Sequence, residues 1–329
     1  MDAAAKGRTR ALWYVGVAAL ILAVAFFAVR GCAFMPWNNG KETVALRLTV
    51  TRDFGGEVLR DERIDLREGS NAMQALQEVA DVETSYGGGF IYGVDGMVSG
   101  YDGTGSGKTD WFYYLNGQMA EVGAAELEVG DGDWLLFDYH PWYYSTFTPA
   151  FAGCFPEPFL HGYGEPPREC LVLFSPGWEE EGEKLADRLG EEGAPSCRME
   201  ELSTEWRPRE DEYAIVIGTF NELEHNDFLA DANGNAARLG LTAYFDGNEL
   251  LVVGEKGEVA ERLDSGAGLV EAIGPRLGEE GSALMVTGTD PDGVRAALSL
   301  LVDWDNTQSG PVMVILARAA EGGTWVPPR

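Results

Sequence analysis

Two neighbouring stretches in which apolar and polar residues alternate constrain the fold of this chain most strongly. Residues 43–52 and residues 57–66 both follow the two-residue period of a β-strand that buries one face. Between them lies Asp-Phe-Gly-Gly at 53–56, which has the composition of a turn. The two stretches are therefore predicted to pair as a hairpin.

A short amphipathic helix is expected directly after this hairpin. Ser70 is a suitable N-cap, and one helical face then carries Met73, Leu76, Val79 and Ala80. Residues 90–94, 111–115 and 134–139 follow as further strands. A hairpin, a helix and then more strands is the order of a β-grasp domain.

The aromatic stretch DWFYYLNG at 110–117 predicts a strand that enters a tight turn. Asn116 and Gly117 are a strong turn signal and are expected to fix the strand register. The preceding DGTGSGKTD at 102–110 is similar to a phosphate-binding loop, but Asp102 occupies the place of its first Gly. Because a strand follows and not a helix, we predict a loop between two strands and no bound nucleotide.

Several of these stretches together resemble the transcobalamin-like C-terminal domain family over about residues 43–139. They are EGSNAMQAL, GGFIYGVDG, DWFYYLNG, the pair Gly123-Ala124 and VGDGDWLLFDY. In the vitamin carriers of that family, this domain closes over cobalamin against a helical barrel, and no part of this chain resembles the barrel. The resemblance implies a cobalamin-like or other vitamin ligand, or a docking role, and a vitamin-uptake transporter as a partner.

The aromatic side chains of this domain are the candidate ligand site. Trp111 and Tyr113 must share one face of their strand, and Tyr114 must lie on the other. One face is expected to pack on the helix, and the other is expected to be free as a ligand platform. The alternative is that all the rings belong to the core. The candidate ligand-binding residues are Phe90, Tyr92, Trp111, Tyr113, Tyr114 and Trp134.

Residues 140–168 are rich in proline and aromatic residues. Repeated proline excludes a regular helix or a central strand, and the rings argue against a floppy linker. We predict an ordered strap that packs on the neighbouring domains. A docking surface for a partner is the alternative.

The residues from 169 to 319 are predicted to form an α/β layered domain. Short apolar runs typical of buried strands occur at 171–174, 214–217, 283–286 and 312–316, and helical patterns occur at 179–189 and 291–301. Asp290 and Pro291 are expected to begin the second of these helices. Residues 241–245 and 250–253 are predicted to form a hairpin insert.

Candidate chemistry in this part of the chain is sparse. The loops 218–221 and 287–290 follow apolar strands, at the edge where open α/β sheets bind ligands, although helix capping is the preferred interpretation. Asp231, Asn233 and Asn235 lack the other residues of a calcium loop. Ser175 and Ser265 lack the context of a nucleophile. His140, His161 and His225 are predicted to be surface or loop residues, and neither a catalytic nor a metal site is expected.

The N-terminal sequence indicates a membrane anchor. Residues 11–29 form an uncharged run of 19 residues, long enough to span a bilayer as a helix. Lys6, Arg8 and Arg10 precede the run, so the residues after it are expected to be extracytoplasmic. The run leads to Cys32, and lipidation of Cys32 is the alternative to an uncleaved anchor.

Charge and cysteine content restrict the partners. The chain has 54 acidic and 24 basic residues and a net charge of −30, which excludes nucleic acid as an expected partner because phosphates would be repelled. Cys154, Cys170 and Cys197 allow a disulfide without requiring one, and their pairing stays open.

The predicted fold class is therefore an N-terminal transmembrane helix, an α+β domain of the β-grasp type and an α/β layered domain. The expected segments are a cytoplasmic N-terminus (1–10), an anchor (11–31), the β-grasp domain (43–139), the strap (140–168), the α/β domain (169–319) and a tail (320–329). The predicted function is capture or delivery of a small molecule by a membrane-anchored extracytoplasmic protein with no intrinsic cofactor and no catalysis. The alternatives are a module that docks on a transporter or envelope component, and an unrecognised surface hydrolase.

Overall fold

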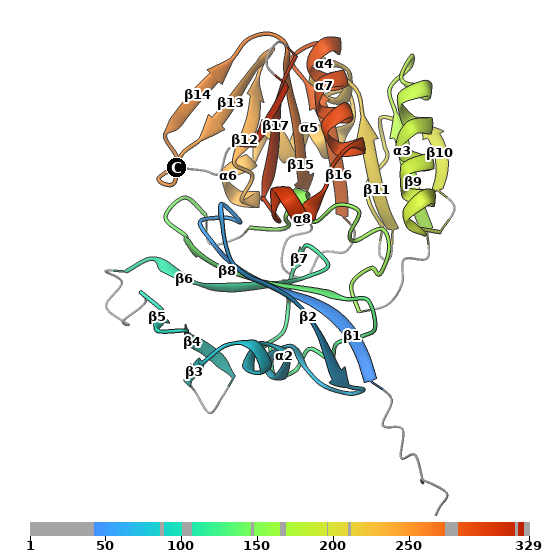
Figure 1. Cartoon of the computed structure of the whole chain (residues 1–329). Helices are drawn as coiled ribbons and strands as arrows, with labels where there is room; N and C mark the ends of the chain where they lie inside the picture. The colour runs from blue at the N-terminus through green and yellow to red at the C-terminus, as the bar shows by residue number, and fades with distance from the viewer. Residues whose placement is uncertain are drawn as a thin grey trace, which may run out of the picture. The chain divides into compact units, whose positions relative to one another are not determined.

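The computed structural model describes residues 43–325, apart from 86–88, 101–106, 146–147, 165–168, 196, 210–211, 274–281 and 320–321. Thr43–Arg329 forms one compact unit, and Met1–Glu42 lies outside the described residues. Figure 1 shows the elements of the compact unit. The domain boundaries expected within it stay predictions.

The first half of the unit is organised around a five-stranded sheet with the order β2-β1-β8-β6-β7. β1 pairs antiparallel with β2, as the alternating pattern predicted, and parallel with β8, which in turn pairs antiparallel with β6. The strands are β1 (Thr43–Arg52), β2 (Glu57–Arg67), β6 (Thr109–Leu115), β7 (Gln118–Met119) and β8 (Trp134–Pro141). The sheet is therefore mixed, with strands from both ends of this segment at its centre.

A helix and a small sheet cover one face of this five-stranded sheet. Helix α2 (Ala72–Val79) buries Met73 and Leu76 in the core that also contains Leu135 and Phe137. The small sheet contains β3 (Val82–Ser85), β4 (Phe90–Val94) and β5 (Met97–Val98). The helix itself was predicted correctly, but its N-cap was not.

Asn71, and not Ser70, is the N-cap of α2. The Asn71 side chain accepts a hydrogen bond of 2.9 Å from the Gln74 backbone N–H, and the Asn71 N–H donates to the Gln74 side chain at 3.0 Å. This reciprocal capping box satisfies two backbone donors that a helix leaves unpaired. Ser and Asn are both suitable N-cap residues. The helix begins after Asn71 because Gln74, three residues further on, completes the capping box.

The predicted turn between β6 and β7 is confirmed. Asn116 and Gly117 both have positive φ, 51° and 78°, as a two-residue hairpin turn of the favoured hand requires. The Asn116 amide is buried and donates to Asp133 Oδ1 at 2.9 Å and to the Gly162 carbonyl at 2.8 Å. Asn116 therefore links the turn to two distant segments as well as shaping it.

The second half of the unit contains a seven-stranded sheet with the order β10-β9-β11-β16-β15-β17-β18. β10, β9, β11 and β16 run parallel, and the pairs β16-β15, β15-β17 and β17-β18 are antiparallel. The strands are β9 (Glu169–Phe174), β10 (Cys197–Glu201), β11 (Glu212–Ile217), β15 (Ala267–Ile273), β16 (Ser282–Gly288), β17 (Val314–Arg318) and β18 (Gly322–Trp325).

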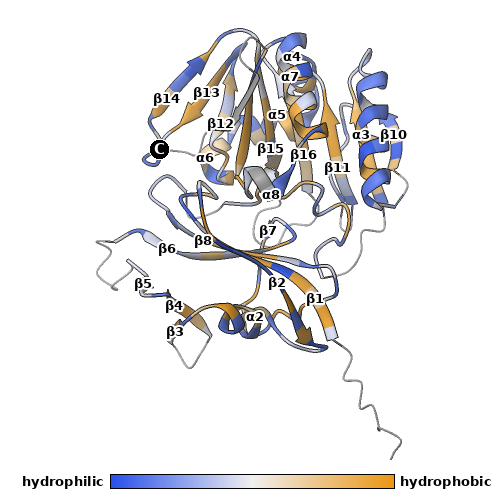
Figure 2. Ribbon diagram, in the orientation of Figure 1, coloured by the Kyte–Doolittle hydropathy of each residue, from blue (hydrophilic) through white to orange (hydrophobic). Residues whose placement is uncertain are grey.

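Different elements cover the two faces of this sheet. Helices α3 (Glu179–Glu192) and α7 (Pro291–Val302) pack on one face, where Leu185 and Val294 belong to the same buried cluster as Val172. The other face is covered by α4 (Phe220–Leu223), α5 (Asp227–Gly234), α6 (Ala236–Leu239) and the small sheet of β12 (Ala243–Asp246), β13 (Glu249–Val253) and β14 (Val259–Leu263). Figure 2 shows apolar residues along the strands of this sheet and hydrophilic residues along α3. Asp290 caps α7 by accepting from Gly293 N–H at 2.9 Å, as predicted.

The predicted fold class was wrong. The structure consists mostly of β-sheets with few helices, because the turn residues after several apolar runs lead into neighbouring antiparallel strands and not into helices. No helix within the described residues is long and apolar enough to span a membrane. The expected anchor at 11–31 and Cys32 lie outside those residues, so the single-pass anchor and the cell-membrane location are not supported.

Hydrogen bonds join the described part of residues 140–168 to both halves of the unit. The 3₁₀-helix η2 (Ala152–Cys154) receives no side-chain cap, but Gly153 N–H donates to the Val312 carbonyl at 2.7 Å and Ala152 N–H donates to that of Met313 at 3.0 Å. Helix α8 (Asn306–Ser309) adds a hydrogen bond of 3.0 Å from the Asn306 amide to the Phe155 carbonyl.

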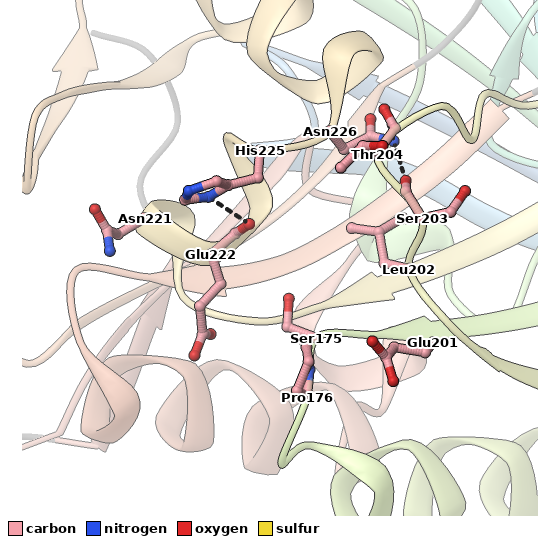
Figure 3. A pocket seen from close by; sticks show the side chains of 10 residues that line it. All are labelled: Ser175, Pro176, Glu201, Leu202, Ser203, Thr204, Asn221, Glu222, His225 and Asn226. Carbon is pink, nitrogen blue, oxygen red and sulfur yellow. Dashed lines mark hydrogen bonds between the residues drawn. The ribbon is translucent and has the colours of Figure 1, made fainter.

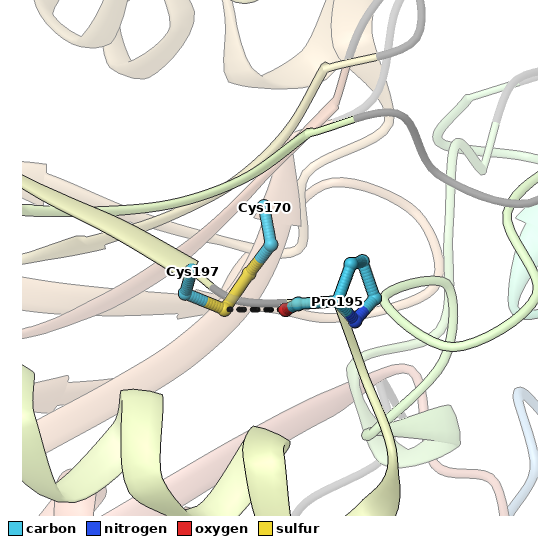
Figure 4. Close-up of a disulfide and its surroundings, with 3 residues drawn as sticks. All are labelled: Cys170, Pro195 and Cys197. Carbon is cyan, nitrogen blue, oxygen red and sulfur yellow. Dashed lines mark hydrogen bonds between the residues drawn. A yellow bond between two sulfur atoms is a disulfide. The ribbon is translucent and has the colours of Figure 1, made fainter.

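A disulfide joins the first two parallel strands of the seven-stranded sheet. It connects Cys170 in β9 with Cys197 in the edge strand β10, as Figure 4 shows. Cys154 is a buried free thiol. The pairing that the sequence left open is therefore Cys170 with Cys197.

Candidate functional site

Three of the six predicted ligand-binding rings are buried in the protein core. Trp111 is 7% exposed and donates from Nε1 to the Met97 carbonyl at 2.9 Å. Trp134 is 4% exposed and donates to Thr49 Oγ1 at 2.8 Å, while the Arg47 guanidinium lies 3.9 Å from its ring centroid. Tyr114 is fully buried. The two indole N–H groups thus have polar partners within the protein, whereas the buried Tyr114 hydroxyl has none within the described residues.

Trp111 and Tyr114 lie on opposite faces of β6, as the strand period required, but the face that carries Tyr114 is not free. Phe151 covers it, with the two ring centroids 4.6 Å apart. The Phe151 N–H donates to the Gly117 carbonyl at 2.8 Å, which fastens this segment over the end of β6. The expected open platform is thus occupied by the chain itself, because residues far along the sequence supply its cover.

The other three predicted residues are more accessible. Tyr113 is partly buried, stacks on Phe137 with a centroid distance of 5.5 Å, and donates its hydroxyl to the Val122 carbonyl. Burial raises the pKa of this Tyr113 hydroxyl. Phe90 and Tyr92, both in β4, are 37% and 38% exposed. Among the six, these two have the most surface for a ligand or a partner.

The loop that resembles a phosphate-binding loop leads into strand β6 and not into a helix. Lys108 lies over the Trp142 ring, with its Nζ 5.2 Å from the ring centroid. The helix N-terminus that a phosphate site uses is therefore missing after Lys108, and residues 102–106 lie outside the described residues.

His140 is buried, contrary to its predicted surface position. Its ring is stacked between Phe54 and Phe112, with centroid distances of 4.3 and 4.2 Å, and its Nδ1 is 2.7 Å from Asp138 Oδ2. Asp138 also accepts from the Phe54 and Gly55 N–H groups at 3.0 Å. The pair therefore fixes the turn between β1 and β2 against β8. The sequence did not indicate this position, because β8 continues past its apolar pattern and includes His140.

The other two histidines lie at the surface or close to it. His161 pairs with Glu157, which raises the pKa of the imidazole through a hydrogen bond of 2.5 Å. His225 is exposed and lies beside a cavity.

This cavity, of about 340 Å³, lies at the carboxyl ends of the parallel strands β9, β10 and β11. Within the sheet, β10 and β11 flank β9 on its two sides. The helices that follow β9 and β11 pack on opposite faces of the sheet. Such a switch point is where open sheets of this kind bind ligands. Its lining residues are Ser175, Pro176, Glu201, Leu202, Ser203, Thr204, Asn221, Glu222, His225 and Asn226.

Ser175 is the most informative residue of this cavity. It follows β9 directly, its N–H donates to the Ile217 carbonyl at 2.9 Å, and the residue is only 3% exposed. Its hydroxyl makes no hydrogen bond within the described residues. Figure 3 shows it directed into the space between the loop with Glu222 and the loop with Leu202. The hydroxyl of this buried residue is therefore open to the cavity, where it can donate to and accept from a bound molecule.

The walls around Ser175 are held by hydrogen bonds. Glu222 Oε2 accepts from Thr219 N–H at 2.8 Å and from Trp178 Nε1 at 2.9 Å, which ties the loop after β11 to the loop after β9. Asn226, 2% exposed, donates to the Ser203 and Trp206 carbonyls at 2.8 Å. These contacts fix all three loops, so the shape of the cavity is set before any ligand arrives.

The chemistry of the lining is polar and acidic. Glu201 and Glu222 supply carboxylates, and neither lysine nor arginine occurs among the lining residues. His225 Nδ1 lies 3.3 Å from the Glu222 carbonyl, its single hydrogen bond within the described residues, and it is not bonded to Ser175. In the described part of the chain, no group of three or more His, Cys, Asp and Glu residues is arranged to hold a metal ion.

Sequence reasoning identified one part of this site. The loop 218–221 was expected either to cap a helix or to bind a ligand, and it does cap α4 while Asn221 also lines the cavity. Ser175, the residues 201–204 and His225 were missed as a group. A usable signal was the sequence Ser175-Pro-Gly directly after an apolar strand, the counterpart of the loop after β11.

The comparisons with known proteins assign no function. Residues 69–141 match a family described as a domain of unknown function (DUF4430). A search of curated proteins finds no match. The transcobalamin-like family expected from the sequence is therefore not confirmed.

Two solved structures are weakly similar to this chain. One is haptocorrin in complex with Cbi, at 15% identity over 31% of this chain and 26% of that chain, with a TM-score of 0.26. The other is a candidate metal-binding protein from Ruminococcus gnavus, at 18% identity over 30% of this chain and 99% of that chain, with a TM-score of 0.23. This chain thus spans about a quarter of the haptocorrin chain, and we base no conclusion about ligands or partners on either likeness.

Proposed function

We propose that this protein binds a small polar molecule in the cavity at the carboxyl ends of β9, β10 and β11. The observation that carries the proposal is the hydroxyl of the buried residue Ser175, which makes no hydrogen bond within the described residues and is directed into the cavity. This hydroxyl is available to pair with a ligand at the wall of the cavity. The volume of about 340 Å³ is within the range of ligand pockets.

Binding without catalysis is the activity we propose. A serine nucleophile needs a base within hydrogen-bonding distance, and the His225 imidazole bonds the Glu222 carbonyl and not Ser175. The loops around the cavity are instead tied to one another by Glu222 and Asn226. Preformed walls favour affinity because little order has to be created when the ligand arrives.

A retained ligand is the direct test. Native mass spectrometry of the protein purified from its own source should detect a small molecule bound to the folded chain. Ser203→Trp should abolish this adduct, because Ser203 is an exposed residue of the rim and an indole there would fill the cavity. Glu205→Trp, two residues further along the same loop and outside the lining, is the matched control.

The outcome that contradicts the proposal is an adduct of equal abundance in the parent protein and both variants. That result would place the ligand elsewhere. If the parent protein carries no adduct, a fragment screen by NMR decides, and it must find compounds that shift the resonances of His225 and Asn226 in the parent protein but not in Ser203→Trp.

The exposed rings of β4 support a second candidate function. Phe90 and Tyr92 are 37% and 38% exposed, and exposed aromatic side chains often mark contact surfaces. A cobalamin-like vitamin is larger than the cavity, so we propose that such a ligand, or a docking protein, would contact these two rings. Calorimetry with cobalamin should then show binding that Phe90→Ala with Tyr92→Ala weakens and that Ser203→Trp does not change. Binding that survives the double substitution would refute this candidate.

A further inference from the structure

The charges around the cavity restrict the ligand further, on the condition that the cavity is the binding site proposed above. We propose that its ligand is a small hydroxylated amine, bound as the ammonium cation. The proposal rests on the carboxylates of Glu201 and Glu222, on the absence of basic side chains from the lining, and on the unpaired hydroxyl of Ser175.

Two arginines lie three residues from the lining in sequence. Arg198, in the same strand as Glu201, lies 3.1 Å from a Glu169 oxygen and 2.9 Å from a Glu200 oxygen. Arg207, on the loop after β10, is exposed and makes no ion pair within the described residues. Glu201 makes no ion pair within the described residues either. An anionic ligand would meet the two carboxylates of the lining, a repulsion that the net charge of −30 reinforces.

The two carboxylates are not equivalent. Both hydrogen bonds that Glu222 accepts end on Oε2, which leaves its Oε1 without a hydrogen bond within the described residues. Glu201 is the last residue of β10, is exposed and lies on the rim. An ammonium group therefore finds a free carboxylate at the rim and a free oxygen on a fixed carboxylate.

The remaining lining favours hydroxyl groups on the same ligand. The Ser175 hydroxyl is both a donor and an acceptor, and the side chains of Ser203 and Thr204 add two exposed hydroxyls on the facing loop. Pro176 and Leu202 are the apolar side chains of the lining. A ligand that carries hydroxyls beside its amine matches this distribution.

Three sugars with the same ring and different charge test the inference. Glucosamine is a cation, glucose is neutral and glucuronate is an anion, and each is titrated into the full chain by calorimetry and by NMR of the His225 and Asn226 side chains. We expect glucosamine to bind most tightly and glucuronate least. We also expect the affinity for glucosamine to fall several-fold when the ionic strength rises from about 0.05 to about 0.5 M, because an exposed carboxylate is screened by salt.

Two substitutions separate charge from the hydroxyl contact. Glu201→Gln should weaken glucosamine roughly two- to fivefold and leave glucose unchanged, as expected for an exposed ion pair. Ser175→Ala should weaken both sugars by a similar factor of roughly five, the effect of one hydrogen bond. Glu200→Gln makes the same change of charge on the neighbouring residue, which does not line the cavity, and should leave all affinities unchanged.

Binding of glucose or glucuronate as tightly as glucosamine would overturn the inference about charge. An equal effect of Glu200→Gln and Glu201→Gln would do so as well. If none of the three sugars shifts the NMR resonances of the His225 and Asn226 side chains, the proposal of a hydroxylated amine is refuted. The proposed binding function is tested separately, by the adduct seen in mass spectrometry and its loss in Ser203→Trp. Loss of the adduct in Ser203→Trp together with no response to glucosamine would leave a binding protein of another ligand class.

Discussion

Glu271→Gln is expected to remove a large part of the pH dependence of this protein's stability. Glu271 lies in β15, is 1% exposed and accepts at Oε1 from the N–H groups of Thr242 and Ala243, at 2.9 and 3.3 Å. Its Oε2 is buried and has no hydrogen-bond partner in the described part of the chain. Burial raises the pKa of this carboxyl from 4.5 to about 8.

The direction of the effect follows from the two pKa values of Glu271. The folded state disfavours the ionised carboxylate, so its contribution is most favourable below pH 4.5 and is lost as the pH rises to about 8. Each pH unit in this window costs about 1.4 kcal/mol, which amounts to about 3 kcal/mol at pH 7. Tyr144, whose pKa is raised to about 12 by burial and then by Glu271, does not titrate in the window.

Glutamine keeps the oxygen that accepts from Thr242 and Ala243 and cannot ionise. The glutamine side chain has one polar group without a partner, and so has the protonated carboxyl of the parent protein. Parent and variant are therefore expected to be about equally stable near pH 4.5. Towards pH 8 the variant should become the more stable protein by several kcal/mol, up to about 5. Because other groups titrate in the same way in both proteins, the difference between them isolates Glu271.

Urea unfolding at pH 5, 6, 7 and 8 measures this difference in the free energy of unfolding. The comparison requires that this free energy falls with urea concentration at the same slope in both proteins. Glu180→Gln, an exposed residue of α3, is the matched control and should leave the pH profile of the parent unchanged. Parallel profiles for Glu271→Gln and the parent protein would refute the reasoning. A variant that is less stable at pH 8 would refute it too.

Four further variants test the structure. Replacing Cys170 and Cys197 with serine removes a crosslink between residues 27 apart and should lower the free energy of unfolding by roughly 3–4 kcal/mol in urea; a loss below 1 kcal/mol would contradict the pairing. Gly117→Ala should cost roughly 2 kcal/mol by the same measurement, because φ is 78° and the new Cβ would lie 2.8 Å from Cys154 Cβ. Tyr114→Ala should cost roughly 3–5 kcal/mol, whereas Tyr92→Ala, at an exposed position, should change stability by less than about 0.5 kcal/mol; equal effects would show that Tyr114 is not in the core.

The features that the sequence predicted well depend on neighbours in the chain. The β1–β2 hairpin follows from alternation, the turn at Asn116 follows from the conformational freedom of the Asn-Gly pair, and the start of α7 follows from Asp290 and Pro291. Each of these signals lies within one continuous stretch of the chain, the longest being residues 43–66, so tertiary contacts only had to agree with it.

The predictions that failed depend on contacts between residues far apart in the chain. The face of β6 with Tyr114 was expected to be open because its cover, Phe151, comes from beyond the strand pattern. His140 was taken for a surface residue because the rings that enclose it, Phe54 and Phe112, come from two other strands or turns. The cavity gathers loops that follow three different strands, so no window of sequence contains it. Contacts of this kind depend on how strands are ordered in a sheet, which local patterns do not specify.

The strap also constrains the order in which this protein can fold. Trp304 Nε1 donates to the Gly153 carbonyl across 151 residues, at 2.9 Å, and the Val312 and Met313 carbonyls accept from the same short segment. Pairing over such a distance requires closure of a long loop and is slow compared with hairpin formation. During synthesis, Phe151 and Tyr114 would thus meet before the residues that lock them in place have left the ribosome. We expect nascent chains that end before Trp304 to hold the first sheet with its strap unsecured, so that residues near the end of the chain complete the half of the protein made first.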